Sequence, residues 1–170
     1  MSARPTARKA ARRPSGSVVL RPGRLDDIAA LRAIEDRAFT HDRLSARSFA
    51  RFLRSPGRLL IVAEADGVVS GHALALFRKR SRFARLYSLA VDPTIRRRKL
   101  GTNLLRAVEA AAVRSQRKAI RLEVKPGNRR ALSLYRTFGY RTLDELDGYY
   151  SDGSKALRLQ KAFGGSNGWA

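Results

Sequence analysis

Apolar residues follow two different spacings along this chain, and each spacing predicts a different kind of element. Apolar positions that recur every three or four residues predict helices with one buried face. Short apolar runs that end at glycine, proline or aspartate predict strands. Residues 1–16 show neither spacing, because small, proline and basic residues fill them. We therefore expect a disordered basic tail over 1–16 and folded structure from residue 17.

Four strands and two helices are predicted in the first half of the chain. The strands cover 17–21, 59–64, 69–77 and 82–91. Asp26 and Asp27 open the first helix, and Ser45 caps the second, which ends at 55–57. Hairpin-sized links predict that the last three strands are antiparallel, and Gly71 marks a candidate bulge.

The second half predicts two more helices and three more strands. The third helix buries a face made of Leu100, Leu104, Leu105, Val108, Ala111 and Ala112. Asn128 is a good N-cap for the fourth helix, which stops at Gly139. The buried face of that helix is formed by Ala131, Leu134, Tyr135 and Phe138. The strands are 119–124, 140–146 and 155–159.

These elements predict an α/β (α+β) fold around one mixed sheet. The strands on either side of the third helix form a parallel pair with a right-handed crossover. The rest of the sheet is mostly antiparallel, and the four predicted helices flank it. With 170 residues, 44% of them hydrophobic, a single domain over 17–163 has enough apolar material for a core. The glycine-rich residues 164–170 are expected to form a flexible tail.

Composition narrows the chemistry and the location. The chain has no cysteine, which excludes disulfides, thiolate metal sites and a cysteine nucleophile, and which fits a reducing compartment. No apolar run reaches the length of a membrane span, and the N-terminus lacks the apolar segment of a secretory signal. We therefore expect a cytoplasmic protein with no membrane partner. His41 and His72 are too isolated to suggest a metal site, so no metal is expected.

The net charge of +22 favours polyanionic partners. The partner could be RNA, a membrane surface, an acidic protein or a phosphorylated cofactor. A solvated arginine-rich surface with no partner would explain the charge equally well. The basic surface and the tail leave open a weak contact with RNA or the ribosome. Charge alone decides neither the fold nor the partner.

The residues 91–105 join a strand to a helix through a basic loop. Its four cations are Arg96, Arg97, Arg98 and Lys99. Backbone N–H groups at the helix N-terminus converge there with these cations, so the expected ligand carries phosphate. An ordinary basic loop before a helix is the alternative.

Two stretches of the chain resemble the GNAT superfamily of acetyl-CoA-dependent N-acetyltransferases. The first is Leu89-Ala90-Val91-Asp92-Pro93 followed by the basic loop and Leu100-Gly101-Thr102. The second is Leu122-Glu123-Val124-Lys125, Asn128, Ala131-Leu132-Ser133-Leu134-Tyr135 and Phe138-Gly139-Tyr140. The resemblance covers roughly 17–163. Together with Tyr149-Tyr150 and Asp152-Gly153, these spacings make the bacterial ribosomal-protein alanine N-acetyltransferases the most similar group within the superfamily.

The resemblance implies that the basic loop binds the pyrophosphate of coenzyme A through its amides. The family pattern is Arg or Gln, two variable residues, Gly, one variable residue, then Gly or Ala. Arg96 and Gly101 fit it, but Lys99 stands in place of the middle glycine and Arg97 in place of another common glycine. Glycine allows close approach and positive φ. Either the backbone is near-helical here, or binding is weaker and the cations offset part of the loss.

The strand before the loop has an implied role as well. Its main chain would bond the pantetheine arm of acetyl-CoA, and the Val91 amide would polarise the thioester carbonyl. Asn128 would bond the pantetheine or the chain ahead of Tyr135, or would serve only as a helix cap. The cofactor-binding residues expected in full are Leu89, Ala90, Val91, Arg96, Arg97, Arg98, Lys99, Leu100, Gly101, Thr102, Asn128 and Tyr135.

Glu123 and Tyr135 are the catalytic residues that the resemblance implies. Glu123 resembles the general base, acting directly or through a water, and desolvation in the cleft would make it a stronger base. Tyr135 resembles the general acid that protonates the departing coenzyme A. The alternatives are a strand-end carboxylate paired with Lys125 or Arg121, and a core tyrosine. Since no cysteine can carry an acyl group, we expect direct transfer in a ternary complex.

Three functions remain open at this point. The first is a protein N-terminal acetyltransferase, with a ribosomal protein or similar chain as acceptor. The second is a GNAT enzyme for a small amine. The third is a non-catalytic RNA- or ribosome-associated protein. The acceptor residues that the resemblance implies are Phe39, His41, Asp42, Tyr149 and Tyr150. A tyrosine pair before a turn can also simply pack. Monomer and homodimer are both open.

Overall fold

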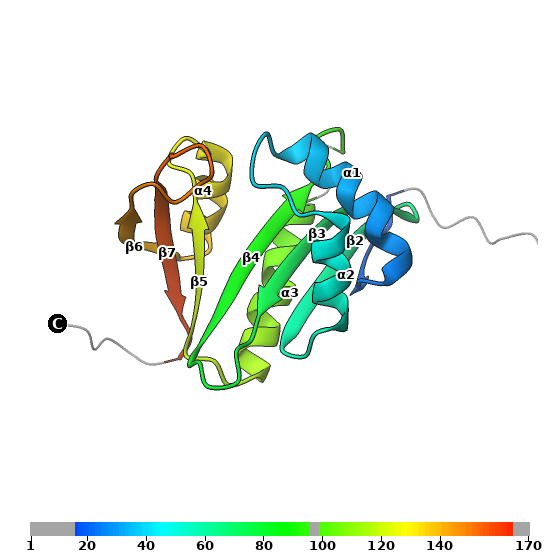
Figure 1. The fold of residues 1–170 in the computed structure, drawn as a ribbon. Coiled ribbons are helices and arrows are strands. Elements are labelled where there is room, and N and C mark those ends of the chain that lie inside the picture. The colour runs from blue at the N-terminus through cyan, green and yellow to red at the C-terminus, as the bar shows by residue number, and fades with distance from the viewer. Residues whose placement is uncertain (1–15, 96–98, 165–170) are drawn as a thin grey trace, which may run out of the picture.

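The computed structural model describes residues 16–95 and 99–164, and Figure 1 shows its fold. The predicted tails lie outside this range except for Gly16 and Gly164, and so do Arg96, Arg97 and Arg98. The helices are α1 (Ile28–Ala38), α2 (Ala46–Arg54), α3 (Leu100–Arg114) and α4 (Arg129–Thr137), with a 3-10 turn, η1 (Leu25–Asp27), ahead of α1. The strands are β1 (Val18–Pro22), β2 (Arg58–Ala65), β3 (Val68–Leu76), β4 (Phe83–Val91), β5 (Ala119–Val124), β6 (Arg141–Leu146) and β7 (Ala156–Ala162).

The predicted fold class is confirmed, because the seven strands form one mixed sheet in the order β1-β2-β3-β4-β5-β7-β6. All neighbouring strands are antiparallel except β4 and β5, which are parallel. The first strand includes Pro22 instead of ending before it. Proline is tolerated there because β1 is an edge strand.

Strands β4 and β5 pair only where they begin. The pairing runs from Phe83 opposite Ala119 to Arg85 opposite Arg121, and beyond it the two strands separate, as Figure 1 shows. Tyr87 is an extra residue in β4, since Leu74 and Ala75 of β3 pair with Ser88 and Leu86. A bulge of this kind bends its strand, which fits the departure of β4 from β5.

A second bulge lies in β3 beside the glycine predicted to mark one. Ala63 and Glu64 pair with Gly71 and Val69, so Ser70 is the extra residue. A Cβ at position 71 would lie 3.1 Å from the carbonyl oxygen of Ala90. Glycine therefore allows β3 and β4 to approach closely next to the bulge.

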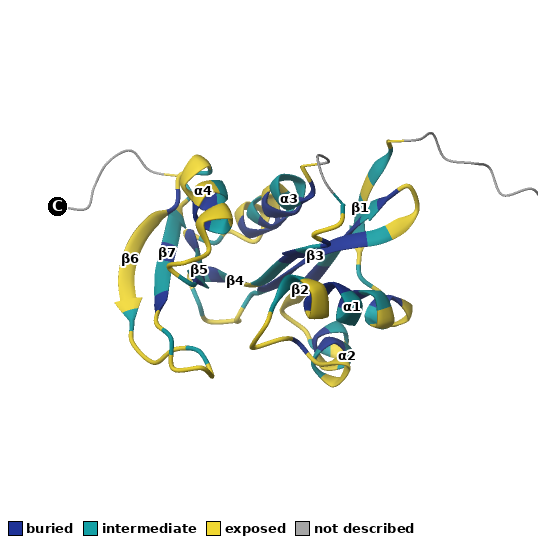
Figure 2. Ribbon diagram, turned by 90° about the horizontal axis from the view of Figure 1, so that it is seen from above, coloured by how far each residue is buried: buried dark blue, intermediate teal, exposed yellow. Residues whose placement is uncertain are grey.

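Two hydrophobic layers cover the two faces of the sheet. Figure 2 shows α3 and α4 on one face and α1 and α2 on the other. The six residues predicted for the α3 core face are all buried. In α4, however, the buried residues are Leu132 and Tyr135, whereas the other three predicted positions are only half-buried. All three pack against the core, and two of them, Ala131 and Leu134, also line a cavity.

Both predicted N-caps are confirmed. Ser45 Oγ accepts a hydrogen bond from the Ser48 amide at 3.0 Å, and Asn128 Oδ1 accepts one from the Ala131 amide at 3.1 Å. Each cap satisfies an amide that has no partner within its helix.

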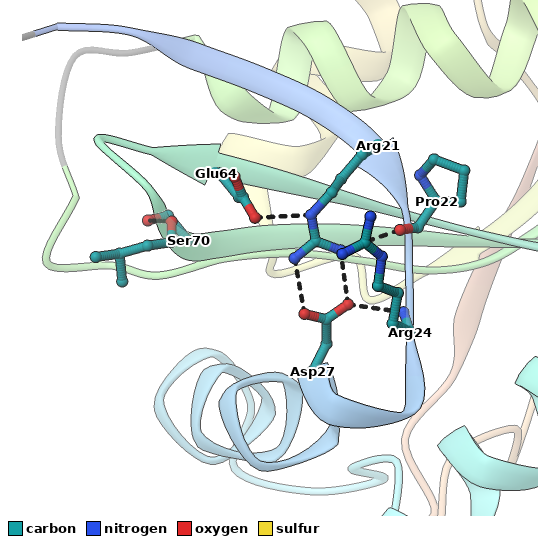
Figure 3. Close-up of polar contacts among 7 residues, drawn as sticks. Arg21, Pro22, Arg24, Asp27, Glu64 and Ser70 are labelled. Atoms are coloured by element: carbon teal, nitrogen blue, oxygen red, sulfur yellow. Dashed lines mark hydrogen bonds and ion pairs between the residues drawn. The ribbon is translucent and has the colours of Figure 1, made fainter. Parts of the chain in front are cut away.

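An ion-pair cluster joins the first strand to the first helical turn and to β2, as Figure 3 shows. Arg21 donates two hydrogen bonds of 2.8 Å to the Asp27 carboxylate and one of 2.7 Å to Glu64. The Arg24 amide also donates to Asp27. The Arg21 guanidinium and this amide outweigh burial and lower the pKa of Asp27. None of the described helices has the length and apolar character of a membrane span.

Candidate active site

Two adjoining cavities lie where β4 and β5 separate. The larger has a volume of about 710 Å³ and the smaller about 340 Å³. The residues that line both are Phe39, Leu89, Asn128, Ala131 and Tyr135. The cavities therefore meet around these side chains, between the C-terminal end of β4 and the start of α4.

The structure places every described residue of the predicted site at one of these cavities. The predicted cofactor residues at the smaller cavity are Leu89, Ala90, Val91, Lys99, Leu100, Gly101, Thr102, Asn128 and Tyr135. The predicted catalytic and acceptor residues at the larger cavity are Glu123, Tyr135, Phe39, His41, Asp42, Tyr149 and Tyr150. Residues about 110 positions apart in the chain thus share one cleft, as expected for a site formed where two strands separate.

The residues at the start of α3 line the smaller cavity. The first bond of this helix runs from the Asn103 amide to the Lys99 carbonyl at 2.9 Å. The amides of Leu100, Gly101 and Thr102 precede it, so they have no partner within the helix. A row of free amides at a helix N-terminus is suited to an anion.

Lys99 has the left-handed backbone conformation that favours glycine, with φ of 49° and ψ of 29°. The near-helical backbone considered from the sequence is therefore not the one found. A lysine in this region costs roughly 1–2 kcal/mol in steric strain compared with the right-handed helix. The backbone at position 99 therefore has the conformation for which the family pattern uses glycine, and the lysine adopts it in spite of the strain.

Sequence reasoning missed two cations at the smaller cavity, Arg37 from α1 and Arg130 from α4. Arg37 donates to Asp92 at 2.6 Å, and Asp92 also accepts from the amide and hydroxyl of Thr94. Burial opposes this charge, but the bonds from Thr94 and Arg37 lower the pKa of Asp92. Asp92 therefore fixes the turn that leads into the basic loop. A sequence carries no signal for Arg37, which lies 55 residues before its partner.

Beyond Arg85, the edge of β4 that faces β5 has no strand partner. The Asp92 amide donates to Ser70 in the direction of β3 at 2.8 Å. Because successive amides along a strand point to opposite edges, the Val91 and Leu89 amides are directed toward the open edge. Both residues line the smaller cavity, so it contains main-chain donors along one wall.

The Glu123 carboxylate is buried between two arginines, with 7% of its side chain exposed. Arg85 Nε donates to one oxygen at 3.1 Å, and Arg158 Nε donates to the other at 3.0 Å. Arg85 also donates to the Tyr149 hydroxyl at 2.6 Å. The sequence led us to expect a carboxylate that is only desolvated, but this one has two charged partners. Through Arg85 it is also linked to Tyr149, one of the predicted acceptor residues.

The ion pairs proposed as alternatives for Glu123 do not form. Arg121 donates to Gln160 at 2.6 Å, and Lys125 donates to Asp152 at 2.6 Å. The partners that do form come from β4 and β7, on either side of β5. Since the order of strands in the sheet decides these pairs, the sequence alone could not reveal them.

Tyr135 lies at the junction of the two cavities. Its side chain is largely buried, at 6% exposed, and its ring packs 5.5 Å from that of Tyr140. Burial raises the pKa of Tyr135 above that of a free tyrosine. The hydroxyl therefore stays protonated at neutral pH and is available as a hydrogen-bond donor.

The acceptor side of the larger cavity is made by two loops that touch. Asp42 accepts a hydrogen bond from the Ser151 amide at 3.3 Å, joining the α1–α2 loop to the β6–β7 loop. The rings of Tyr149 and Tyr150 stand edge to face, 5.0 Å apart. Burial, with the neighbouring Tyr149, raises the pKa of Tyr150 to about 12. The expected aromatic wall is therefore present and uncharged at neutral pH.

A buried polar cluster that the sequence did not reveal lies at the larger cavity, which Glu35 and Ser88 line. His72 Nε2 and Ser88 Oγ each lie 3.1 Å from Glu35 Oε1, and the Leu44 amide donates to Glu35 Oε2 at 2.8 Å. His72 is fully buried in this cluster. Glu35 anchors the end of the loop that carries His41 and Asp42.

Known proteins resemble this chain in sequence. The sequence pattern of the acetyltransferase (GNAT) family matches residues 28–140. A Bacillus subtilis protein described as an alanine N-acetyltransferase of ribosomal protein bS18 is 28% identical over 135 residues, which is 79% of this chain and 88% of that one. An N-alpha-acetyltransferase of Sulfolobus acidocaldarius is 29% identical over 126 residues, 65% of this chain and 73% of its own length.

A solved structure shares the fold as well. The alanine N-acetyltransferase of ribosomal protein S18 from Escherichia coli superposes with a TM-score of 0.77 at 24% identity. The match covers 91% of this chain and all of that one. At this identity the likeness shows the fold alone.

Proposed function

Since the chain belongs to the acetyltransferase (GNAT) family, we propose that it transfers the acetyl group of acetyl-CoA to the N-terminal amine of a protein. The observation that carries this proposal is the pair of cavities that meet at Tyr135. One presents free helix amides and cations, and the other presents a carboxylate and tyrosines. A phosphate-bearing acetyl donor in one cavity and an amine acceptor in the other would thus meet beside the Tyr135 hydroxyl.

The smaller cavity fits the requirements of acetyl-CoA. The α3 amides, with Lys99 and Arg130 beside them, would hold the pyrophosphate. The open edge of β4 would bond the amide groups of the pantetheine arm. Bound there, acetyl-CoA supplies an acetyl group activated as a thioester. The Val91 amide would then stabilise negative charge on the carbonyl oxygen.

Glu123 would take a proton from the acceptor, and Tyr135 would stabilise the leaving group. The acceptor amine is protonated at neutral pH, and Glu123 would take its proton directly or through a water. The chain has no cysteine to carry an acyl group, so the amine would attack the thioester directly. A free thiol has a pKa of about 8.5, below that of tyrosine. With its pKa raised further by burial, Tyr135 would stabilise the departing sulfur chiefly by donating a hydrogen bond.

The acceptor proposed is the α-amine of a basic protein such as a ribosomal protein. The described functions of the Bacillus subtilis and Sulfolobus relatives support this class of acceptor. The walls of the larger cavity, Phe39, Tyr149 and Tyr150, suit an extended peptide end. Both cavities are lined by residues of one chain, so a monomer would suffice. We place the enzyme in the cytoplasm, since a cysteine-free chain fits a reducing compartment.

Thermal unfolding with and without acetyl-CoA tests the donor site. Saturation at about 100 times Kd stabilises the folded state by about 2.7 kcal/mol, so the Tm should rise by several degrees. Gly101→Leu should abolish the rise, because a large side chain there would enter the smaller cavity. Ala110→Leu, an exposed change in the same helix, should behave like the wild type. No rise in the wild type would refute the donor site.

Glu123→Gln tests the base. It keeps the shape of the side chain but removes its capacity to accept a proton, so kcat should fall by about 100-fold or more while the acetyl-CoA shift persists. Glu145→Gln, at an exposed carboxylate of β6, should leave kcat unchanged. Equal turnover of the Glu123 variant and the wild type would reject this role.

A further inference from the structure

One end of the molecule carries a dense group of cations, which we call the basic pole. The β3–β4 loop and the turn between α3 and β5 form it. Its cations are Arg78, Lys79, Arg80, Arg82, Arg114, Arg117 and Lys118. All except the half-buried Arg117 are exposed. In Figure 1 this end lies at the bottom, where β4 and β5 begin. The two cavities are lined by later residues of these strands, from Arg85 in β4 and from Leu122 in β5 onward.

The two segments of the basic pole are fixed to each other. The Lys118 amide donates to the Arg82 carbonyl at 2.8 Å, and the Arg117 guanidinium donates to the Ser81 carbonyl. The Ser81 hydroxyl in turn donates to the Phe83 carbonyl at 2.9 Å. The cations therefore stand on one preformed surface, which lowers the entropy lost when a partner binds.

No acidic side chain neutralises this surface. The sequence contains no Asp or Glu between Asp66 and Asp92 or between Glu109 and Glu123. Glu109 accepts from Lys161, and Glu123 is held by two arginines. Among the described residues, no ion pair involves a cation of the pole, and residues 1–15, 96–98 and 165–170 contain no Asp or Glu.

Some other parts of the surface pair their cations with acids, although residues 43–63, which include α2, also contain no Asp or Glu. Arg32 pairs with Asp36 on α1, and Lys155 pairs with Glu145 beside the acceptor loop. Such pairing is what a merely solvated basic surface would show. A row of cations without acids instead matches a regular array of phosphates.

We infer that the basic pole binds the phosphate backbone of structured RNA. The nearby rings, Phe77 and Phe83, are half-buried under the guanidiniums of Arg117 and Arg121, at 5.9 Å and 3.8 Å. They do not form an exposed platform for stacking bases. Val113 is the one large exposed apolar residue beside the pole, so a lipid surface would gain little insertion. Binding to the phosphate backbone of an RNA duplex needs neither stacking nor insertion, because the cations alone make the contacts.

RNA at the pole would leave both cavities open, because they lie at the other end of β4 and β5. The inference therefore does not depend on the proposed activity. It gives the enzyme a means to stay near an RNA-rich assembly while the cleft receives an acceptor. Backbone contacts would make this binding independent of RNA sequence and strongly dependent on salt.

Fluorescence anisotropy of the full chain with a labelled RNA duplex of about 20 base pairs tests the inference between ~50 and ~300 mM salt. The variant R78Q/K79Q/R80Q/R82Q removes four cations of the pole. The control R47Q/R106Q/R136Q/R141Q removes four exposed arginines from other faces, none of which lines a cavity. Both variants have the same net charge.

The pole variant should raise Kd by about 10-fold or more and reduce the slope of log K against log salt by about three. The control should change both much less. R114Q/K118Q, on the second segment, should reduce the slope by about half as much. Equal losses in the pole variant and the control would overturn the inference, since the binding would then follow net charge alone. Pole-dependent binding to phosphatidylserine vesicles without binding to RNA would also overturn it.

Discussion

Lys99 shows how a single residue can oppose the local preference of the chain and still serve the site. Its left-handed backbone directs the first turn of α3 toward the smaller cavity, although glycine would adopt that conformation without strain. The sequence comparison identified this position as unusual. It could not tell whether the backbone or the binding had changed, because side-chain identity does not fix φ.

Lys99→Gly should therefore leave stability unchanged or raise it by up to about 1 kcal/mol, as relief of strain outweighs the extra entropy of the unfolded chain. Ala110→Gly, in the interior of the same helix, should lower stability by about 1 kcal/mol. Urea unfolding of both variants measures the difference. A Lys99 variant that loses as much stability as the Ala110 variant would contradict the argument from strain.

Tyr135 and Tyr140 allow a matched test of the role proposed for the Tyr135 hydroxyl. Their rings touch, but only Tyr135 lines the cavities. Tyr135→Phe should lower kcat by about 100-fold and leave the KM for acetyl-CoA nearly unchanged, because the hydroxyl would act mainly as charge develops on sulfur. Tyr140→Phe should retain kcat. Similar rates for both variants would show that Tyr135 is a core residue.

At the scale of elements, the sequence predicted the helices and strands well because burial repeats with their period. The α3 core face was correct at all six positions. The separation of β4 from β5 was not predicted. It depends on the bulge in β4, where one residue has no partner in β3. The sequence of a single strand does not determine how that strand pairs with its neighbour. For the same reason, the arginines on Glu123 became visible only when β4, β5 and β7 were placed side by side.

The two helix caps separate stability from binding. Asn128→Ala and Ser45→Ala each remove one cap and should each lower stability by about 1 kcal/mol. Only Asn128 lines the cavities, so only its loss should raise the KM for acetyl-CoA. Steady-state kinetics and urea unfolding of both variants check this. Equal KM values for the two variants would show that Asn128 serves only as a helix cap.

The cluster of Arg21, Asp27 and Glu64 should make stability depend on pH. The folded-state pKa of Asp27 is lowered, so its contribution is present above about pH 4 and is lost as the pH falls through the folded value. Asp27→Asn should therefore lower the free energy of unfolding by about 2 kcal/mol at pH 7 and by less at pH 3. Asp26→Asn, at an exposed neighbour, is the control. A difference from the wild type that does not shrink in acid would contradict the account.

At the scale of the whole molecule, the charge of +22 is distributed unevenly. The basic pole has no acids, whereas the larger cavity is lined by Glu35, Asp42 and Glu123 as well as by cations. So basic an enzyme should repel a basic acceptor unless the positive charge is lower around the acceptor cavity. The fold gathers these three carboxylates around that cavity, although the chain places them far apart.

The most direct test of the central claim is an acetylation assay with matched acceptors. One peptide carries a free N-terminal amine, and a second has the same sequence with a blocked N-terminus and an internal lysine. A panel of small amines completes the set. Release of coenzyme A and the mass of each product are measured. We predict acetylation of the free N-terminus, lost in the Glu123→Gln variant. Transfer only to small amines, or to none of these acceptors, would contradict the account.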